Sequence, residues 1–205
     1  MKPVSFTSAD TGEELERAEL YGLLARLWFA PPDAALFAQF RVAVTEAPER
    51  GAFLEAPWQT LVAAMRASNE DEAADEYAAL FHGVGKADVF LNASYHLAGA
   101  LNEKPLAALR SDLEALGLAR EVAVSETEDH VTYLFEVMRY LIAGQDVELC
   151  NLERQRRFFR EHVQPWLGTL CDLVEQHPRA RLYAALAAFT RAFVQVETQA
   201  FDMLE

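Results

Sequence analysis

Residues 128–138, with the sequence Glu-Asp-His-Val-Thr-Tyr-Leu-Phe-Glu-Val-Met, decide the fold of this 205-residue chain. From residue 131 onward, apolar side chains recur at the i, i+3, i+4, i+7 spacing of one helical face: Val131, Leu134, Phe135, Met138, Leu141 and Ile142. This pattern predicts a buried helix over about 127–143 that begins with the polar residues Glu128, Asp129 and His130. We expect Asp129 and His130 to be partly exposed there, beside a groove lined by apolar residues of the 76–96 region.

The same three polar residues also fit a purely structural role. Ser125 or Thr127 can serve as the N-cap of the helix, and Glu128, three residues after Ser125, completes a capping box. Acidic residues in a first helical turn interact favourably with the helix dipole, which explains Glu128 and Asp129 without any binding function. His130 gains nothing from that end of the dipole, so this alternative accounts for it less well.

Nearly every other apolar cluster has the helical period, and no segment shows the two-residue period of a strand. The sequence therefore predicts an all-α fold, a single-domain bundle of about ten helices. Thr11 is expected to cap a first helix with Glu14 as its capping-box partner, and Asp33 to begin a second one. We assign residues 1–10 to an N-terminal tail and residues 11–205 to the helical domain. Further helices are expected at about 56–68, 70–81, 94–101, 105–117, 127–143, 147–162, 164–176 and 179–203. The predicted core includes Phe81, Leu134, Met138, Phe189 and Phe193.

The composition limits the classes of function. A formal net charge of −14 argues against nucleic acid or an anionic membrane surface as the main partner, and it would attract a basic one. No apolar run is long enough to span a bilayer, and the first residues lack the apolar core of a secretory signal. Cys150 and Cys171 fit neither a zinc pattern nor a disulfide framework, which suits a reducing compartment. We therefore expect a cytoplasmic protein without membrane insertion.

Catalytic and metal sites find little support in the sequence. Asp129 and His130 suggest an acid–base dyad, but adjacent residues on a helix point about 100° apart, and no HExxH, GxSxG or CxxC motif accompanies them. Metal binding by His130, His162 and a carboxylate would need the fold to bring them together. The Gly83-Val84-Gly85-Lys86 stretch lacks the spacing of a phosphate loop. We predict no catalytic residue, no metal and no cofactor. A small helical enzyme or nucleotide-hydrolysing factor centred on Asp129 and His130 is kept as an alternative.

Two further stretches combine aromatic and polar residues. Residues 76–81 (Glu-Tyr-Ala-Ala-Leu-Phe) place Tyr77 and Phe81 on one helix face, and residues 92–96 (Asn-Ala-Ser-Tyr-His) follow a glycine-containing loop. Core packing explains most of these residues, and an apolar rim with a nearby carboxylate is the alternative. Residues 158–166 (Phe-Phe-Arg-Glu-His-Val-Gln-Pro-Trp) fit a sharp corner between two helices, set by Pro165.

In this order and at these intervals, the three stretches resemble the TorD/DmsD family of redox-enzyme maturation chaperones, over about residues 15–200. The resemblance implies a non-enzymatic, all-α cytoplasmic protein that binds the twin-arginine signal peptide of a molybdenum-cofactor oxidoreductase. It also implies that the protein holds the immature enzyme until its cofactor is inserted, as a monomer or a domain-swapped homodimer. The chain departs from the family pattern at Thr127, where proline is usual, and at Leu91-Asn92, where a proline-aromatic pair is usual.

The resemblance also implies roles for particular residues. Family members use the Asp-His pair, here Asp129 and His130, to recognise the signal peptide, and Glu128 is similar to the acidic residue that precedes the pair. Further peptide contacts are expected from Tyr77, Phe81, Asn92 and Tyr95. The chemistry agrees, because the guanidinium groups of a twin-arginine leader need carboxylates and its apolar stretch needs a groove of apolar side chains. A structural adaptor subunit of an oxidoreductase is a further alternative. The sequence identifies neither the client enzyme nor a directly bound nucleotide or molybdenum cofactor.

Overall fold

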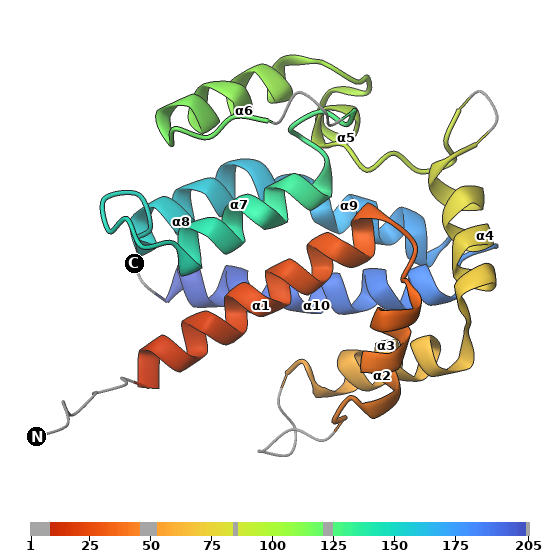
Figure 1. Cartoon of the computed structure of the whole chain (residues 1–205). Helices are drawn as coiled ribbons and strands as arrows, with labels where there is room; N and C mark the ends of the chain where they lie inside the picture. Colours follow the sequence, from red (N-terminus) through yellow and green to blue (C-terminus); the bar gives the residue numbers. More distant parts are fainter. Residues whose placement is uncertain (1–8, 46–52, 84–85, 121–124, 204–205) are drawn as a thin grey trace, which may run out of the picture.

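The computed structural model describes residues 9–45, 53–83, 86–120 and 125–203, and every regular element in these ranges is a helix (Figure 1). The elements are α1 (Ala9–Phe29), α2 (Ala34–Val42), α3 (Glu55–Ala67), α4 (Glu70–Phe81), α5 (Ala93–Ala98), α6 (Lys104–Ala115), α7 (Val131–Ala143), α8 (Leu152–Phe158), the π-helical segment η1 (Phe159–Val163), α9 (Gln164–Glu175) and α10 (Leu182–Asp202). The β interaction in these ranges is an isolated antiparallel bridge between Asn92 and His130. The predicted all-α fold is confirmed. Within the described part of the chain, no helix is both long and apolar enough to cross a bilayer.

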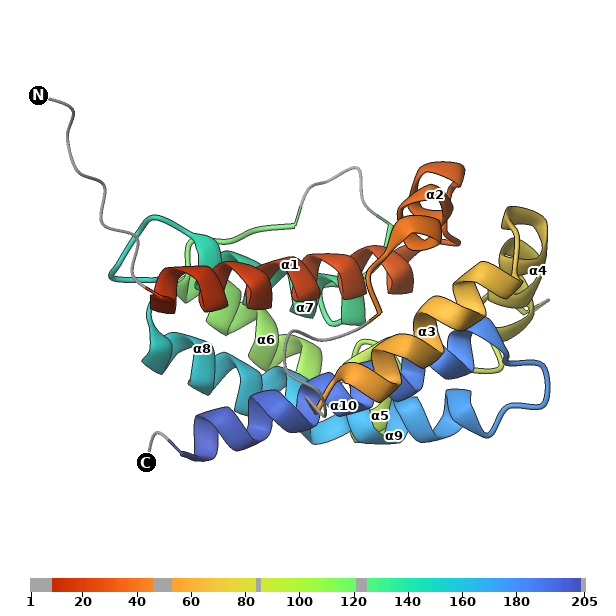
Figure 2. The same ribbon diagram turned by 90° about the horizontal axis from the view of Figure 1, so that it is seen from below.

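Two groups of packed helices form the centre of the fold. α1 packs along α7, while α10 packs along α9 and against α3. Figure 1 shows α6 as an outer element on the side of α7 away from α10, and Figure 2 shows α1 and the α9–α10 pair on opposite sides of the molecule. Among the helices, α6 contacts mainly α5. It therefore covers the outer side of α7, and its Leu109 and Leu113 side chains join the buried core.

Aromatic side chains fill the space between the central helices. The ring centroid of Tyr21 on α1 lies 5.7 Å from that of Phe135 on α7 and 4.8 Å from that of Phe193 on α10. The indole of Trp28 donates a 3.0 Å hydrogen bond to the hydroxyl of Thr190, so its polar atom is satisfied inside the core. The five side chains predicted to form the core are all buried: Phe81, Leu134, Met138, Phe189 and Phe193.

An ion pair also lies between α1 and α10. Arg17 donates to both carboxylate oxygens of Glu197, at 2.9 and 2.8 Å, and the Tyr21 hydroxyl donates to the same carboxylate at 2.9 Å. The side chain of Glu197 is only 2% exposed. The sequence predicts only a helix with core residues here and not this ion pair, whose members are 180 residues apart. A buried carboxylate is costly without its partner, so the pair fixes α1 against α10.

Some helix ends differ from the prediction. α1 begins at Ala9, so Thr11 lies inside the helix and is not its N-cap. Most of the tail predicted for residues 1–10 lies outside the described residues. Asp33 is confirmed as the N-cap of α2, because its carboxylate accepts a 2.8 Å hydrogen bond from the backbone N–H of Leu36.

The start of α7 also differs. The helix begins at Val131 with His130 as its N-cap, so the predicted start at residue 127 is wrong. The predicted capping box of Ser125 and Glu128 is therefore wrong as well. A polar connection precedes the helix, and it carries the residues that matter for the site.

Candidate functional site

Glu128, Asp129 and His130 lie in the connection before α7 and not on the helix itself. This connection runs beside residues 91–93: the N–H of Ala93 donates to the carbonyl of Asp129 at 2.9 Å, and the N–H of Val131 donates to that of Leu91 at 2.8 Å. The three side chains diverge, and each lines a different pocket. The triplet is therefore not a single cluster of charged groups.

Asp129 is fully buried, which contradicts the expected partial exposure. Its carboxylate accepts hydrogen bonds from the backbone N–H of Ser94 at 2.8 Å, the hydroxyl of Thr127 at 2.5 Å and the amide of Asn92 at 3.4 Å. Burial alone would raise the pKa of Asp129, but these hydrogen bonds outweigh it and lower the pKa below its usual value. The ionised carboxylate holds the 91–94 segment against the 127–131 connection. Both of its oxygens are therefore already engaged by protein donors.

His130 is also buried, with 5% of its surface exposed, so the expected exposure is wrong for this residue as well. Its Nδ1 atom accepts a 3.3 Å hydrogen bond from the backbone N–H of Thr132. Burial lowers the pKa of His130 to about 4, against a smaller opposing effect of Asp129. The imidazole is therefore neutral at pH 7 and carries its proton on Nε2. That N–H is the donor that the ring retains for a ligand.

A pocket of about 380 Å³, called here the histidine pocket, lies where α4, the end of α1 and the connection before α7 meet. It brings together four of the predicted site residues, Tyr77, Phe81, Asn92 and His130. The other lining residues are Phe29, His82, Ala87, Val89, Phe90, Leu91, Leu101, Ser125 and Glu126.

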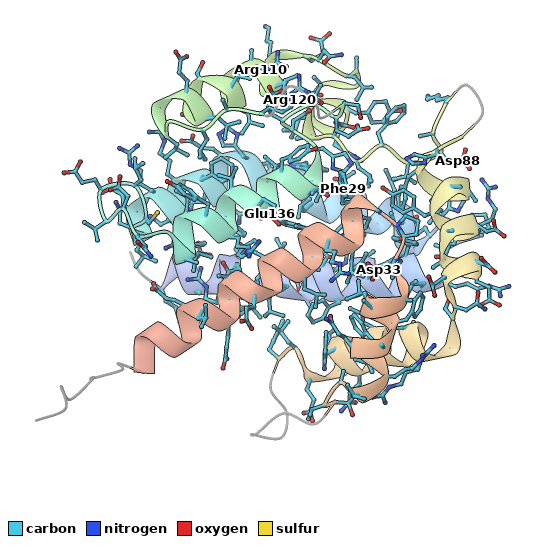
Figure 3. All side chains as sticks on the ribbon, in the orientation of Figure 1. Phe29, Asp33, Asp88, Arg110, Arg120 and Glu136 are labelled. Carbon is cyan, nitrogen blue, oxygen red and sulfur yellow. The ribbon has the colours of Figure 1, made fainter. Side chains whose placement is uncertain are left out.

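The lining of the histidine pocket is mainly aromatic and aliphatic. The Tyr77 hydroxyl donates to the carbonyl of Phe29 at 2.7 Å, and burial raises the pKa of Tyr77 above its usual value. Phe29, labelled at the end of α1 in Figure 3, is 52% exposed, and Leu101 is 42% exposed. Two large apolar side chains therefore stand at the surface beside a buried aromatic wall.

Glu126 is the acidic residue that lines this pocket. It is exposed, and among the described residues no hydrogen bond or ion pair engages its carboxylate. Its negative charge helps to raise the pKa of Tyr77. The sequence predicts the acidic role for Glu128 and Asp129 and not for Glu126. The sequence signal that could have identified Glu126 is its position in the polar stretch 125–129. The sequence does not tell which of the three carboxylates in that stretch faces a pocket.

Glu128 points away from the histidine pocket and is already paired. Arg110 on α6 donates to one of its oxygens at 3.0 and 2.8 Å, and Arg120 lies 3.5 Å from the other. Burial alone would raise the pKa of Glu128, but the two arginines and a backbone hydrogen bond lower it. Its main contribution in this structure is to tie α6 to the connection before α7.

The two remaining predicted residues have different surroundings. The amide of Asn92 donates to Thr127 at 3.0 Å as well as to Asp129, so Asn92 supports the wall of the histidine pocket. The ring of Tyr95 is 4.2 Å from that of Phe90, and the ammonium of Lys86 lies 5.9 Å from both ring centroids. Tyr95 is not among the residues that line the pocket.

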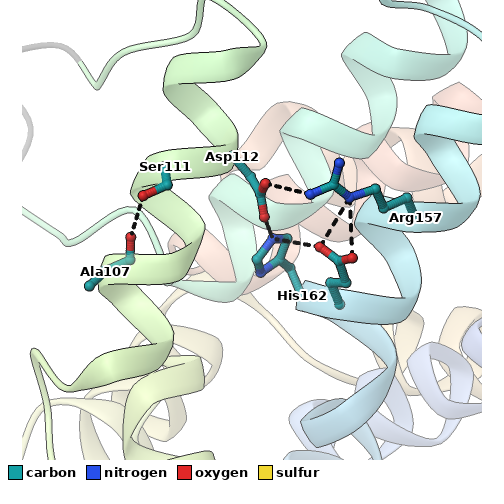
Figure 4. Close-up of polar contacts among 6 residues, drawn as sticks. Ala107, Ser111, Asp112, Arg157 and His162 are labelled. Atoms are coloured by element: carbon teal, nitrogen blue, oxygen red, sulfur yellow. Dashed lines mark hydrogen bonds and ion pairs between the residues drawn. The ribbon is translucent and has the colours of Figure 1, made fainter.

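His130 and His162 do not form the metal site considered from the sequence. His162 instead contacts Asp112 on α6, with 2.7 Å between Nε2 and the carboxylate, beside Glu161 (Figure 4). Three ligand atoms of this group lie within 4.8 Å of one another, but the Arg157 guanidinium donates to Asp112 at 2.9 Å and to Glu161 at 3.2 Å. Because this cation already pairs with both carboxylates, the group is a salt-bridge cluster that joins α6 to η1.

Comparisons with known proteins agree on one family. A family model described as nitrate reductase delta subunit matches residues 48–172, which include every residue of the histidine pocket except Phe29. The chain is 27% identical over 210 residues to chaperone protein TorD of Vibrio cholerae serotype O1 (strain ATCC 39315 / El Tor Inaba N16961), covering 92% of this chain and 93% of the relative. It is 26% identical, with the same coverage, to the TorD protein of strain ATCC 39541 / Classical Ogawa 395.

Proposed function

The chain belongs to the TorD/DmsD family of redox-enzyme maturation chaperones, and we propose that its histidine pocket binds the twin-arginine signal peptide of a client oxidoreductase. The protein is a chaperone and not an enzyme. The client is a molybdenum-cofactor enzyme that is held in its immature form until the cofactor is inserted, and then released for export. The protein acts in the cytoplasm, as a monomer or a domain-swapped homodimer.

The observation that carries this proposal is the Glu126 carboxylate, which has no partner among the described residues and lies beside the aromatic wall of the histidine pocket. An arginine side chain combines a planar cation with an apolar stem, and it binds best where a carboxylate lies next to aromatic faces. Glu126 supplies the charge, and Tyr77 and Phe81 supply the rings. Of the residues that the structure describes, no other carboxylate lines this pocket.

His130 suits a second contact. Its neutral ring retains an N–H donor on Nε2, which matches a backbone carbonyl of a bound peptide. The Asp129 carboxylate holds the segment around it and takes no direct part in binding. Asn92 acts in the same way, through its bonds to Thr127 and Asp129.

The charge of the whole molecule supports the same partner. A net charge of −14 steers a basic leader toward the surface and raises its association rate at low salt. A leader becomes ordered on binding, so part of the interaction energy is lost as conformational entropy and the affinity is moderate. A moderate affinity suits a chaperone that must release its client.

Binding of synthetic leaders to the purified full chain tests the proposal. We expect a twin-arginine leader to bind in calorimetry, and a Lys-Lys version to bind more weakly, because lysine lacks the bidentate geometry of the guanidinium. Glu126→Gln should weaken the twin-arginine leader about ten- to a hundredfold, while Glu72→Gln, at an exposed carboxylate on α4, should leave it unchanged. Equal binding of both leaders, or no binding of either, would refute the proposed function.

A further inference from the structure

A second pocket, of about 340 Å³, lies between α6 and the outer face of α7. It is called here the α7 pocket and is lined by Leu113, Leu118, Ala119, Arg120, Glu128, Tyr133, Glu136, Val137 and Tyr140. Figure 3 labels Arg110 and Arg120 on the α6 side of this region and Glu136 on α7. The arginine binding proposed above does not use this pocket.

The charged groups of the α7 pocket are held in ion pairs. Glu128 is bound by Arg110 and Arg120, and Glu136 accepts a 3.1 Å hydrogen bond from Arg139. Between these pairs the wall consists of leucine, valine, alanine and tyrosine side chains. Such a site has no carboxylate to offer an arginine, but it suits aliphatic side chains, since their transfer from water to an apolar wall is favourable.

Tyr133 brings a buried polar group into the lining of the α7 pocket. Its hydroxyl oxygen is buried and has no hydrogen-bond partner among the described residues. A buried hydroxyl without a partner is unfavourable, and a bound peptide backbone would supply one. Tyr140, at the other end of the pocket, is 37% exposed, so the site is open to a ligand from outside.

The two pockets meet at the connection before α7. Glu126 and His130 line the histidine pocket, while Glu128, between them in the chain, lines the α7 pocket. The ring centroid of His130 is 6.0 Å from that of Tyr133, so one residue from each pocket lies at their common border. Burial raises the pKa of Tyr133, and the negative charge of Glu126 raises it further, as it does for Tyr77.

We propose that the α7 pocket binds the apolar stretch that follows the arginine pair of a leader, while Glu126 holds the arginines at the border. This inference rests on the proposed function and extends it to a second subsite. A leader presents its arginines and its apolar stretch in direct succession. The two neighbouring pockets offer a carboxylate that is unpaired within the described part of the chain and, beside it, an apolar wall. An extended chain advances by about 3.3–3.6 Å per residue, so a few residues suffice to pass from one pocket to the other.

The test fills the α7 pocket and compares two leaders. Ala119 is an exposed residue outside the helices that lines the pocket, so Ala119→Trp places an indole there without disturbing the core. Ala35→Trp, at an exposed position on α2 that lines neither pocket, is the matched control. One leader keeps its leucines, and in the other leader serines replace them.

Ala119→Trp should weaken the leucine leader at least tenfold and leave the serine leader unchanged, whereas Ala35→Trp should change neither. A wild-type affinity of Ala119→Trp for the leucine leader, or an equal loss for both leaders, would overturn the inference. Failure of the wild-type protein to bind either leader would instead remove the proposed function itself. The two failures are therefore distinguishable.

A second measurement on the wild-type protein does not depend on any variant folding. A leader with a photo-reactive benzophenone in its apolar stretch should cross-link to Tyr133, Val137 or Tyr140, as identified by mass spectrometry. Cross-links confined to Phe29 and Leu101, at the histidine pocket, would overturn the inference.

Discussion

Asp129→Asn separates a structural role of this residue from a binding role. The substitution keeps the size of the side chain and removes its charge. In the wild-type protein both carboxylate oxygens accept hydrogen bonds, from the N–H of Ser94 on one side and from Thr127 and Asn92 on the other. An asparagine must turn its NH2 group toward one of these sides. If the NH2 group turned toward Ser94, it would meet a backbone N–H, which is also a donor. If it turned toward Asn92, it would meet the NH2 group of another amide.

The expected cost follows from these contacts. Hydrogen bonds to a charged group contribute about 1.5–3 kcal/mol, and an unsatisfied buried donor costs about 1–3 kcal/mol. Because asparagine retains one of the accepted bonds, we expect a loss of about 2 kcal/mol in the free energy of unfolding. For a protein of this size that corresponds to roughly 4–8 °C in the melting temperature.

Thermal unfolding followed by circular dichroism at pH 7 measures the effect, with Glu126→Gln as the matched control. Glu126 has an exposed side chain without a partner among the described residues, so its substitution should leave the melting temperature unchanged. If Asp129→Asn melts like the wild-type protein but no longer binds a leader, Asp129 itself contacts the peptide. That result would refute the structural role assigned to it here.

Three further predictions follow from the buried groups and the charge. The pKa of His130 falls from 6.5 to about 4 in the folded state, so the unfolded chain binds more protons between these pH values. The free energy of unfolding should therefore drop by about 3 kcal/mol as the pH falls through this window. His130→Asn retains an N-cap acceptor but cannot take up this proton, so its free energy of unfolding should drop less. Urea unfolding at pH 7 and at pH 4 measures the difference. Glu197→Ala should cost about 3–5 kcal/mol in the same assay, because it leaves Arg17 without its buried partner, and a loss below 1 kcal/mol would contradict that role. Raising the salt from 0.1 to 1 M should weaken leader binding and slow association, since the Debye length shortens from about 10 to 3 Å, while an unchanged affinity would leave only apolar contacts as its source.

The sequence predicts the helices well because their determinants are local. The apolar period around Leu134 and Met138 gives a buried helix wherever that face is covered, and Asp33 caps α2 through a bond to a residue three positions away. The start of α7 depends on distant partners. Its connection is fixed by the bridge between Asn92 and His130, so the local capping pattern of Ser125 and Glu128 does not decide it.

Long-range polar contacts are the part of the fold that periodicity cannot reveal. Glu197 lies on the same helix as the apolar residues of the core, and only the approach of Arg17 explains its burial. Glu76 precedes Tyr77 in a stretch for which an apolar rim with a nearby carboxylate is the alternative to core packing. Its carboxylate instead accepts three backbone hydrogen bonds at the start of α10, from residues 181–183. In both cases the sequence shows a carboxylate but not its partner.

The site is predicted as a region but not in its details. Tyr77, Phe81, Asn92 and His130 converge on one pocket, although they come from separate parts of the chain. Which carboxylate serves that pocket depends on the path of the connection before α7, where successive side chains face different pockets. The motif therefore draws attention to Asp129, while the geometry favours Glu126. Their roles in peptide binding stay predictions.

The most direct test of the central claim is the energetic coupling between Glu126 and the arginines of a leader. A double-mutant cycle combines Glu126→Gln with leaders in which one arginine is replaced by glutamine, and Glu128→Gln serves as the reference. We predict a coupling of about 1.5–3 kcal/mol for Glu126 and near zero for Glu128, whose carboxylate is held by Arg110 and Arg120. Additive effects for Glu126, or a larger coupling for Glu128, would contradict the claim that the histidine pocket binds the arginine pair through Glu126.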